Sequence, residues 1–360
     1  MSSEATSLAW LNAVGMSGDP NAVVGPLRGY HHETYVLPLP EGQGPLGAGR
    51  WKCREPRSGL MWFDRRCFRS EEQLLKGLAG RIDRIPDILD VGEFGLQRFV
   101  EGVTLGALYP SGQAVPDRLT GQVLELFEQL AGVTPRTLTV PRRCRRPDRP
   151  EDGDSAAFLE RLITFAETHV HADNLPVFGQ LFADLGLDGG AFVSLRAHVS
   201  GLKERPFCLL HADLHRENFI VDDQERLWTI DWELAMLGDP LYDLATHLYL
   251  MRYPPEQQER ITKGWRETVE RVRPGSAHGL AEDLPLLIDF KRAQSVFTDV
   301  IRVALSLDPG ADPRGLRRVR AGWKLYKILL AAAEPLGLRS VPSPWRIVAA
   351  LTKWRAARPA

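Results

Sequence analysis

The sequence is poor in cysteine, which accounts for only four of its 360 residues. No two of the four form a C-x-x-C pair or a zinc-site spacing, so we expect neither a disulfide framework nor a structural zinc. A protein with this cysteine content is most simply explained as residing in a reducing compartment. No run of about twenty apolar residues occurs, and the first fifteen residues lack the basic and apolar regions of a signal peptide. We therefore expect a cytoplasmic chain with no membrane partner.

Net charge is also nearly absent, because 45 basic residues face 46 acidic ones. This balance argues against general nucleic-acid binding and against an acidic, disordered chain. With 44% hydrophobic and 25% charged residues, the composition is that of an ordinary globular protein. A chain of 360 residues can form two domains or one bilobal unit, and no internal repeat divides it.

The most informative stretch runs from Phe207 to Asp243. Apolar runs at 207–210, 219–221 and 227–230 predict strands, and the polar turn 222–226 makes the last two a hairpin. Polar side chains that can act as bases or metal ligands gather at the ends of these strands. They are His211, Asp213, His215, Asn218 and Asp231.

Their spacing points to phosphoryl transfer. Residues 211–218 match the kinase catalytic-loop pattern H-R-D-L-x-x-x-N at every defined position except Ala212, which replaces the arginine. Asp213 would accept the proton of the attacking hydroxyl, and Asn218 and Asp231 would hold Mg²⁺ against the nucleotide phosphates. The hairpin should fold Asp231 back beside Asn218.

The motif His211-Ala-Asp-Leu-His-Arg-Glu-Asn218 followed by Ile230-Asp-Trp-Glu233 resembles the aminoglycoside phosphotransferase and choline kinase family. The family pattern has Gly where this chain has Ala212. The resemblance implies an α+β, bilobal, protein-kinase-like fold with ATP or GTP in the cleft, Mg²⁺ on the phosphates and a small-molecule hydroxyl as acceptor. It also implies that the segment Asp239 to Ala245 supports the catalytic loop.

A different metal site was also considered. His211, Asp213 and His215 could bind zinc or iron in a hydrolase, since imidazole and carboxylate suit these metals. That interpretation leaves Asn218, the hairpin and Asp231 unexplained.

The first lobe should cover residues 1 to about 101, with a helix near 4–16 followed by five strands. The strands are expected near 23–27, 34–37, 50–54, 85–92 and 96–100. Gly29 and Tyr30 lie in the turn between the first two strands, where a kinase covers the phosphates. Residues 102–360 should form the larger, helical lobe.

Further nucleotide contacts are predicted in the first lobe. Lys52 in the third strand would meet the α- and β-phosphates and be held by Glu71 of the following helix, with Glu72 as the second choice. The resemblance implies that the last strand leads into a hinge whose backbone groups meet the nucleotide base. Its candidate residues are Gln97, Phe99 and Val100.

Residues 141–150 contain five arginines and three prolines and should not be helical. They form either a solvated loop or a docking site for an anionic group or a peptide. Arginines at the cleft entrance would disfavour a polycationic aminoglycoside.

The resemblance implies that the later helices line the acceptor pocket, in which Asp213 would meet the hydroxyl. Predicted acceptor contacts besides Asp213 are Glu233, Asp289, Arg292 and Asp299. Only seven residues separate Asp231 from Asp239, which leaves no room for a long activation segment and favours a small acceptor.

Three functions remain open at this point. The first is a Mg²⁺-dependent O-phosphotransferase acting on an antibiotic, an amino sugar or another hydroxylated metabolite. The second is a kinase for Ser or Thr in a peptide of natural-product biosynthesis, and the third is a nucleotide-binding pseudokinase. The chain could be a monomer or a homodimer.

Overall fold

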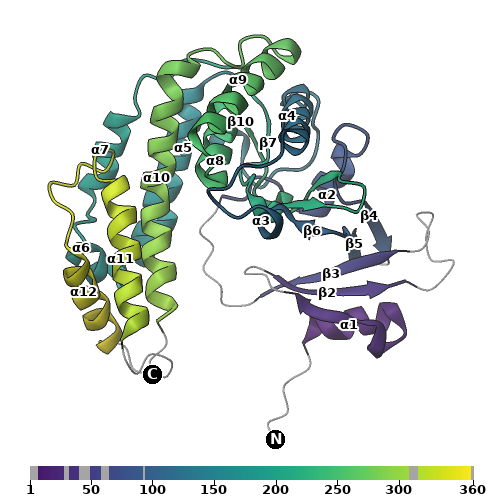
Figure 1. Cartoon of the computed structure of the whole chain (residues 1–360), viewed down its shortest axis with the longest axis horizontal. Coiled ribbons are helices and arrows are strands. Elements are labelled where there is room, and N and C mark those ends of the chain that lie inside the picture. Colours follow the sequence, from purple (N-terminus) through teal and green to yellow (C-terminus); the bar gives the residue numbers. More distant parts are fainter. Residues whose placement is uncertain are drawn as a thin grey trace, which may run out of the picture.

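The computed structural model describes residues 7–27, 32–39, 49–57, 65–91, 94–307 and 315–357. Gly29 and Tyr30, which we predicted over the phosphates, lie outside these ranges. Within them the chain forms a β-rich first lobe and a larger helical lobe (Figure 1). The bilobal α+β fold predicted from the sequence is therefore confirmed.

The first lobe is built on an antiparallel sheet with the order β1-β2-β3-β5-β4. All five strands expected from the sequence are present. They are β1 (Val24–Leu27), β2 (His32–Pro38), β3 (Arg50–Pro56), β4 (Ile88–Val91) and β5 (Phe94–Arg98). Helix α1 (Leu8–Ser17) packs on β2 and β3, and α2 (Glu71–Leu78) packs on β4 and β5.

The alternation of side chains along β3 determines the direction in which its basic residues Lys52 and Arg54 point. Trp51 and Cys53 are buried in the small core that α1 contributes to. Because successive side chains of a strand point to opposite faces, Lys52 and Arg54 point away from this core. Both therefore face α2 and the interior of the molecule.

Two small sheets of the second lobe hold the stretch 207–243. Strand β7 (Cys208–Leu210) pairs with β10 (Met236–Gly238), and β6 (Val103–Thr104) pairs with the hairpin β8–β9. The hairpin consists of β8 (Phe219–Val221) and β9 (Leu227–Thr229), in the predicted register around the turn 222–226. Polar residues at the strand ends are thereby brought to one side of the lobe.

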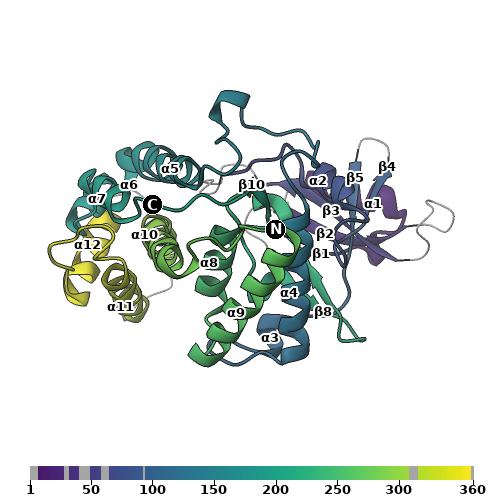
Figure 2. The same cartoon turned by 90° about the horizontal axis from the view of Figure 1, so that it is seen from above.

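Helices make up the rest of the second lobe (Figures 1 and 2). They are α3 (Leu105–Leu108), α4 (Asp117–Gly132), α5 (Ser155–Phe165), α6 (Leu175–Asp184), α7 (Gly190–His198), α8 (Pro240–Met251), α9 (Pro255–Val272), α10 (Leu280–Leu305), α11 (Leu316–Ala331) and α12 (Pro344–Ala356). Among the described residues, none of the helices is both long and apolar enough to cross a membrane.

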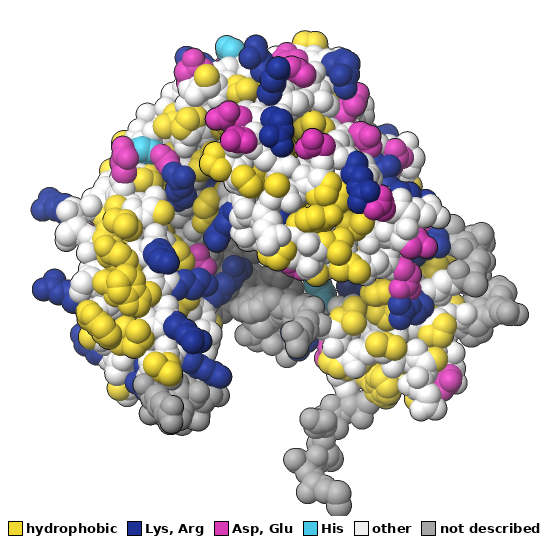
Figure 3. All heavy atoms as spheres, in the orientation of Figure 1, with side chains coloured by type: hydrophobic (Ala, Val, Ile, Leu, Met, Phe, Trp, Pro, Cys, Tyr) yellow, Lys and Arg dark blue, Asp and Glu magenta, His cyan; other side chains and the backbone are white. Residues whose placement is uncertain are grey.

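Two irregular segments of this lobe matter for the site. Helix α5 ends at Phe165, and the chain continues as a π-helix over Ala166–His171. The arginine-rich chain between α4 and α5 arches between α5 and α2 (Figure 2), and Arg142 pairs with Phe68 in an isolated β-bridge. Figure 3 shows that the molecule is hollowed between the helical lobe and the sheet of the first lobe.

Candidate active site

The catalytic loop is fixed by helix α8. Asp243 accepts hydrogen bonds from the backbone N–H groups of His211 (3.0 Å) and Ala212 (2.7 Å). Burial raises the pKa of the Asp243 carboxyl to about 6, although the two backbone donors lower it. The supporting role that the resemblance implied for the segment 239–245 is thus seen in atomic contacts.

His211 holds the loop against the end of the hairpin. Its Nε2 lies 3.1 Å from the carbonyl oxygen of Ile230, to which it donates, and its ring meets Trp232 edge-on. Burial lowers the pKa of His211 to about 4, so the ring is neutral at pH 7. We predicted a catalytic role, but the structure buries the side chain completely, which makes His211 a positioning residue.

Asp213 and Asn218 are joined directly. The side-chain nitrogen of Asn218 donates to the carbonyl oxygen of Asp213 (2.9 Å) and to its carboxylate (3.2 Å). Asn218 is buried, whereas the Asp213 side chain is 28% exposed. Since the nitrogen of Asn218 is used as a donor, Oδ1 is the atom that could bind a cation.

His215 contacts Asp213 from the other side, with Nε2 3.4 Å from the carboxylate. Its Nδ1 accepts a hydrogen bond from the N–H of Glu217, so the proton of the neutral ring lies on Nε2. Burial lowers the pKa of His215, but the hydrogen bond and the charge of Asp213 outweigh it and raise the pKa overall.

The hairpin returns Asp231 to this loop, as predicted. The N–H of Ile230 donates to the carbonyl oxygen of Asn218 at 3.0 Å. Asp231 itself has φ 65, a left-handed conformation that Asp tolerates better than most residues. Burial, followed by the charges of Glu71 and Asp213, raises the pKa of Asp231 to about 6.

Three carboxylates converge beside the loop. Glu71, Asp231 and Glu233 each offer an oxygen, and these oxygens lie within 4.8 Å of one another. Burial and the charge of Asp231 raise the pKa of Glu233 to about 7. Carboxylate oxygens are hard donors of the kind that Mg²⁺ prefers, so the chemistry of this cluster fits that ion.

The zinc or iron alternative finds no such convergence. His211 is buried with Nε2 directed at a carbonyl oxygen, and only His215 approaches Asp213. Over the described ranges, the three residues do not form a cluster with metal-ligand spacing.

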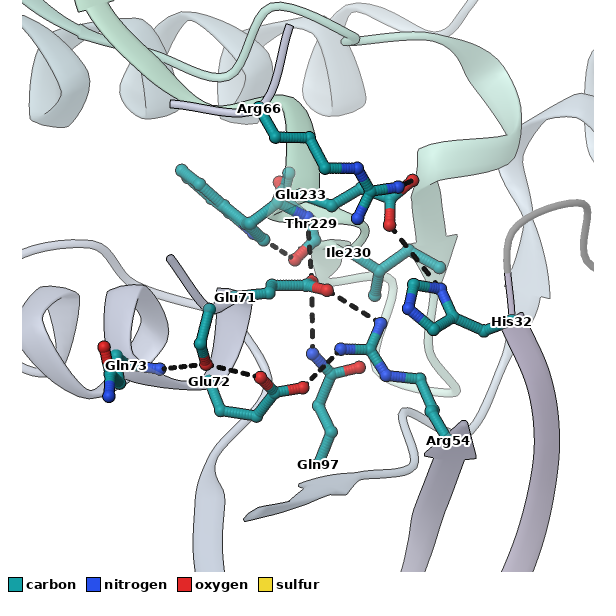
Figure 4. Close-up of polar contacts among 12 residues, drawn as sticks. His32, Arg54, Arg66, Glu71, Glu72, Gln73, Gln97, Thr229, Ile230 and Glu233 are labelled. Carbon is teal, nitrogen blue, oxygen red and sulfur yellow. Dashed lines mark hydrogen bonds and ion pairs between the residues drawn. The ribbon is translucent and has the colours of Figure 1, made fainter. Parts of the chain in front are cut away.

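The salt bridge that we expected between Lys52 and Glu71 is replaced by another. Glu71 pairs with Arg54 (2.7 Å), and Arg54 also pairs with Glu72 (2.6 Å), as Figure 4 shows. The same Glu71 accepts from Gln97 (3.2 Å) and from the backbone N–H of Trp232 (2.9 Å). No role was predicted for Arg54, although it lies two residues after Lys52 on the same face of the strand.

Lys52 remains close to the carboxylates without a salt bridge to them among the described contacts. Burial and the charge of Arg54 lower the pKa of Lys52 to about 8, while Glu71 and Asp231 raise it. An ammonium group in this setting would gain from a nearby phosphate.

The predicted base-binding residues divide into two groups. Gln97 is buried opposite Lys52 and donates a hydrogen bond to Glu71. Its side chain therefore lies inside the first lobe. Phe99 and Val100 follow β5 in the connection to β6, where a hinge was expected; the N–H of Phe99 donates to the carbonyl oxygen of Arg50. Their contact with a nucleotide base stays a prediction.

The acidic residues predicted to contact the acceptor are all close to cations of the chain. Glu233 pairs with Arg66 (2.8 Å), and Asp289 pairs with His198 (3.0 Å) and Arg292 (2.7 Å). Asp299 lies 3.9 Å from Lys324. Their role in acceptor binding stays a prediction.

A cavity of about 670 Å³ opens beside Trp232 and Glu233. It lies between α2 and the π-helical segment, which contributes His169. Glu71 and Glu233 line the cavity and Asp231 does not, so the cavity adjoins the carboxylate cluster rather than enclosing it.

The sequence profile of the Phosphotransferase enzyme family (APH) matches residues 29–274, about two thirds of the chain. The chain belongs to this family. It is accordingly a phosphotransferase with a hydroxyl acceptor, as the catalytic-loop motif predicted.

The chain is similar to several solved structures, of which the first supports the fold. A choline/ethanolamine kinase family protein from Mesorhizobium loti is 18% identical with a TM-score of 0.51, covering 96% of this chain and 98% of its own. A macrolide 2'-phosphotransferase from Brachybacterium faecium is 16% identical (TM-score 0.49; 93% and 99% covered). Choline kinase LicA from Streptococcus pneumoniae is also 16% identical (TM-score 0.49; 88% and 98% covered).

Proposed function

We propose that this phosphotransferase moves the γ-phosphate of a nucleoside triphosphate to the hydroxyl of a small molecule in a Mg²⁺-dependent reaction. The observation that carries the proposal is the joining of Asp213, Asn218 and Asp231. Asn218 donates to Asp213, and its carbonyl oxygen holds the hairpin that ends in Asp231. This arrangement supports transfer to a hydroxyl, because it joins a general base to the predicted metal ligands.

Each residue has a distinct task in this mechanism. Asp213, which is partly exposed, accepts the hydroxyl proton and orients the oxygen for attack. Asn218 Oδ1 and the Asp231 carboxylate would hold Mg²⁺, which would supply positive charge to the phosphates. Lys52 provides a second positive charge for the phosphates, and Glu71 keeps α2 in contact with the backbone next to Asp231.

A small acceptor is favoured over a protein substrate by the path of the chain after Asp231. Residues Trp232–Leu234 form a short helix and Met236–Gly238 form β10, which pairs with β7 and leads directly into α8. The connection is therefore occupied by structure and contains no long loop for docking a peptide.

The test separates nucleotide binding from transfer. Asp213→Asn should keep the affinity for ATP and Mg²⁺, measured by calorimetry, while radiolabelled phosphate transfer falls by roughly three orders of magnitude or more. Asp231→Ala should abolish Mg²⁺-dependent nucleotide binding. Asp223→Asn, an exposed residue of the hairpin turn, serves as the control and should change neither. Unchanged transfer by Asp213→Asn would contradict the proposed mechanism.

A further inference from the structure

We infer that the acceptor carries a negative charge, as a carboxylate or phosphate, in addition to its hydroxyl. The inference rests on the proposed function and names the charge class of the small molecule that the site takes. It comes from the charges around two cavities, a larger one beside the carboxylate cluster and a smaller one at the catalytic loop.

The larger cavity has both signs of charge in its lining. Its cations come from β3, from the segment before α2 and from the arginine-rich loop, and are Arg54, Arg66, Arg69 and Arg143. Its carboxylates are Glu71, Glu72, Asp173 and Glu233. Which sign is available to a ligand depends on how these groups are paired.

Every one of these carboxylates is already held by a basic side chain of the protein. Arg54 binds both Glu71 and Glu72, and Arg66 binds Glu233 at 2.8 Å (Figure 4). In the π-helical wall, His169 lies 2.9 Å from Asp173. A cationic ligand would therefore have to displace an existing partner.

Two of the arginines that line the larger cavity, Arg69 and Arg143, differ from these paired groups. Arg143 donates from Nε to the carbonyl oxygen of Phe68 (3.1 Å) and from Nη2 to that of Arg69 (3.2 Å), which are neutral acceptors. No carboxylate within the described parts of the chain pairs with the guanidinium of Arg143 or of Arg69, and both side chains are exposed. Carbonyl oxygens orient Arg143 without neutralising it, so both charges are open to an anion.

The smaller cavity, of about 40 Å³, lies directly against the catalytic loop at Ala212. It shares Phe165 with the larger cavity and contains Arg65 and Lys291, with no carboxylate in its lining. Lys291 lies over the ring of Tyr242 and donates to its hydroxyl. The two charged residues that line the smaller cavity are thus both cations.

These observations assign a purpose to the arginine-rich loop. Its β-bridge to Phe68 holds Arg143 beside Arg69 at the cavity, while Arg145 and Arg146 of the same loop are exposed outside it. Guanidinium groups recognise carboxylate and phosphate oxygens by paired hydrogen bonds. A polycationic acceptor such as an aminoglycoside would meet carboxylates that already have a basic neighbour in this cavity.

The experiment measures binding before activity. A library of small hydroxylated compounds, with equal numbers of anions, neutral molecules and cations, is incubated with the full chain and retained compounds are identified by mass spectrometry. We expect the retained set to be enriched in anions, and Arg69→Gln with Arg143→Gln to weaken their binding at least tenfold. Arg69→Gln alone should also weaken the binding of anions, and it leaves the hydrogen bonds of Arg143 to backbone carbonyl oxygens in place. Arg145→Gln with Arg146→Gln, in the same loop, is the matched control and should bind as wild type.

Retention of cations as strongly as anions, retention of no anion, or an equal loss in the control pair overturns the inference. Phosphate transfer from ATP to the retained compounds is then assayed. Retained anions that are never phosphorylated leave the charge class standing and contradict the proposed function. Faster transfer to a cationic acceptor than to any anion leaves the function standing and refutes the charge class.

Discussion

At the scale of single residues, Ala212 occupies a position that suits glycine. Its φ of 66 lies in the left-handed region, where a Cβ is strained, and its N–H is fixed by Asp243. We expect Ala212→Gly to raise the free energy of unfolding in urea by about 1 kcal/mol, because relief of the strain exceeds the entropy that glycine adds to the unfolded chain. Ala349 lies at an exposed position of helix α12, and Ala349→Gly should lower the free energy of unfolding by a similar amount. A loss of stability in Ala212→Gly would show that the loop is not strained.

The raised pKa of Asp231 predicts a pH-dependent response to Mg²⁺. A carboxyl whose pKa rises to about 6 on folding stabilises the fold below pH about 4 and loses this contribution as the pH rises through 6. Mg²⁺ competes with that proton, so its apparent affinity should be about fourfold weaker at pH 5.5 than at pH 8 from Asp231 alone. The shift in melting temperature with Mg²⁺ at constant ionic strength measures this, and Asp231→Asn should remove most of it. An equal shift at both pH values would contradict the assigned ligand.

At the scale of elements, Glu71 connects helix α2 to the backbone next to Asp231. One carboxylate oxygen accepts from Trp232 and Gln97, and the other pairs with Arg54. Glu71→Gln should lower kcat/KM about 10- to 100-fold, since the contact orients the backbone beside a metal ligand.

Glu72→Gln is the matched control, because Glu72 also pairs with Arg54 but lies at the rim. It should stay within a few-fold of wild type in kcat/KM. If kcat/KM falls equally in both variants, the salt bridge with Arg54 accounts for the effect and the contact with Trp232 does not contribute.

Periodic elements were the predictable part of this fold. Alternating apolar residues identified all five strands of the first lobe, and the polar turn 222–226 fixed the hairpin. The change from α-helix to π-helix after Phe165 was missed, because both helices present similar apolar patterns. Helix ends depend on side-chain caps and tertiary contacts that a single sequence does not reveal.

The candidate site was predictable where it follows from local order in the chain. Asp213, Asn218 and Asp231 are linked by one loop and one hairpin, so their meeting could be inferred. The pairing of Glu71 with Arg54 could not, since Lys52 and Arg54 point to the same face and only side-chain packing selects one. Arg66 and Arg143 reach the site from irregular segments, for which the sequence offers no register.

At the scale of the whole molecule, one buried arginine joins the parts that position the loop. Arg205 donates to both oxygens of Asp239 (2.8 and 2.7 Å), which caps α8 through the N–H of Leu241. It also donates to Asp283 of α10 at 2.6 Å. Helix α8 in turn carries Asp243, whose contacts hold the catalytic loop, so the network connects α10 to the reacting groups.

Arg205→Met should therefore destabilise the chain by about 3–5 kcal/mol, since two buried carboxylates lose their counter-charge. Adding Asp239→Asn and Asp283→Asn should recover part of this loss, because the cost comes from unpaired charge rather than from lost attraction. Arg196→Met, which breaks the partly exposed pairs with Glu160 and Glu167, is the control and should cost less than about 1 kcal/mol. Urea unfolding measures all three; a loss for Arg205→Met no larger than for Arg196→Met would mean that α8 is held by its apolar packing against α10 alone.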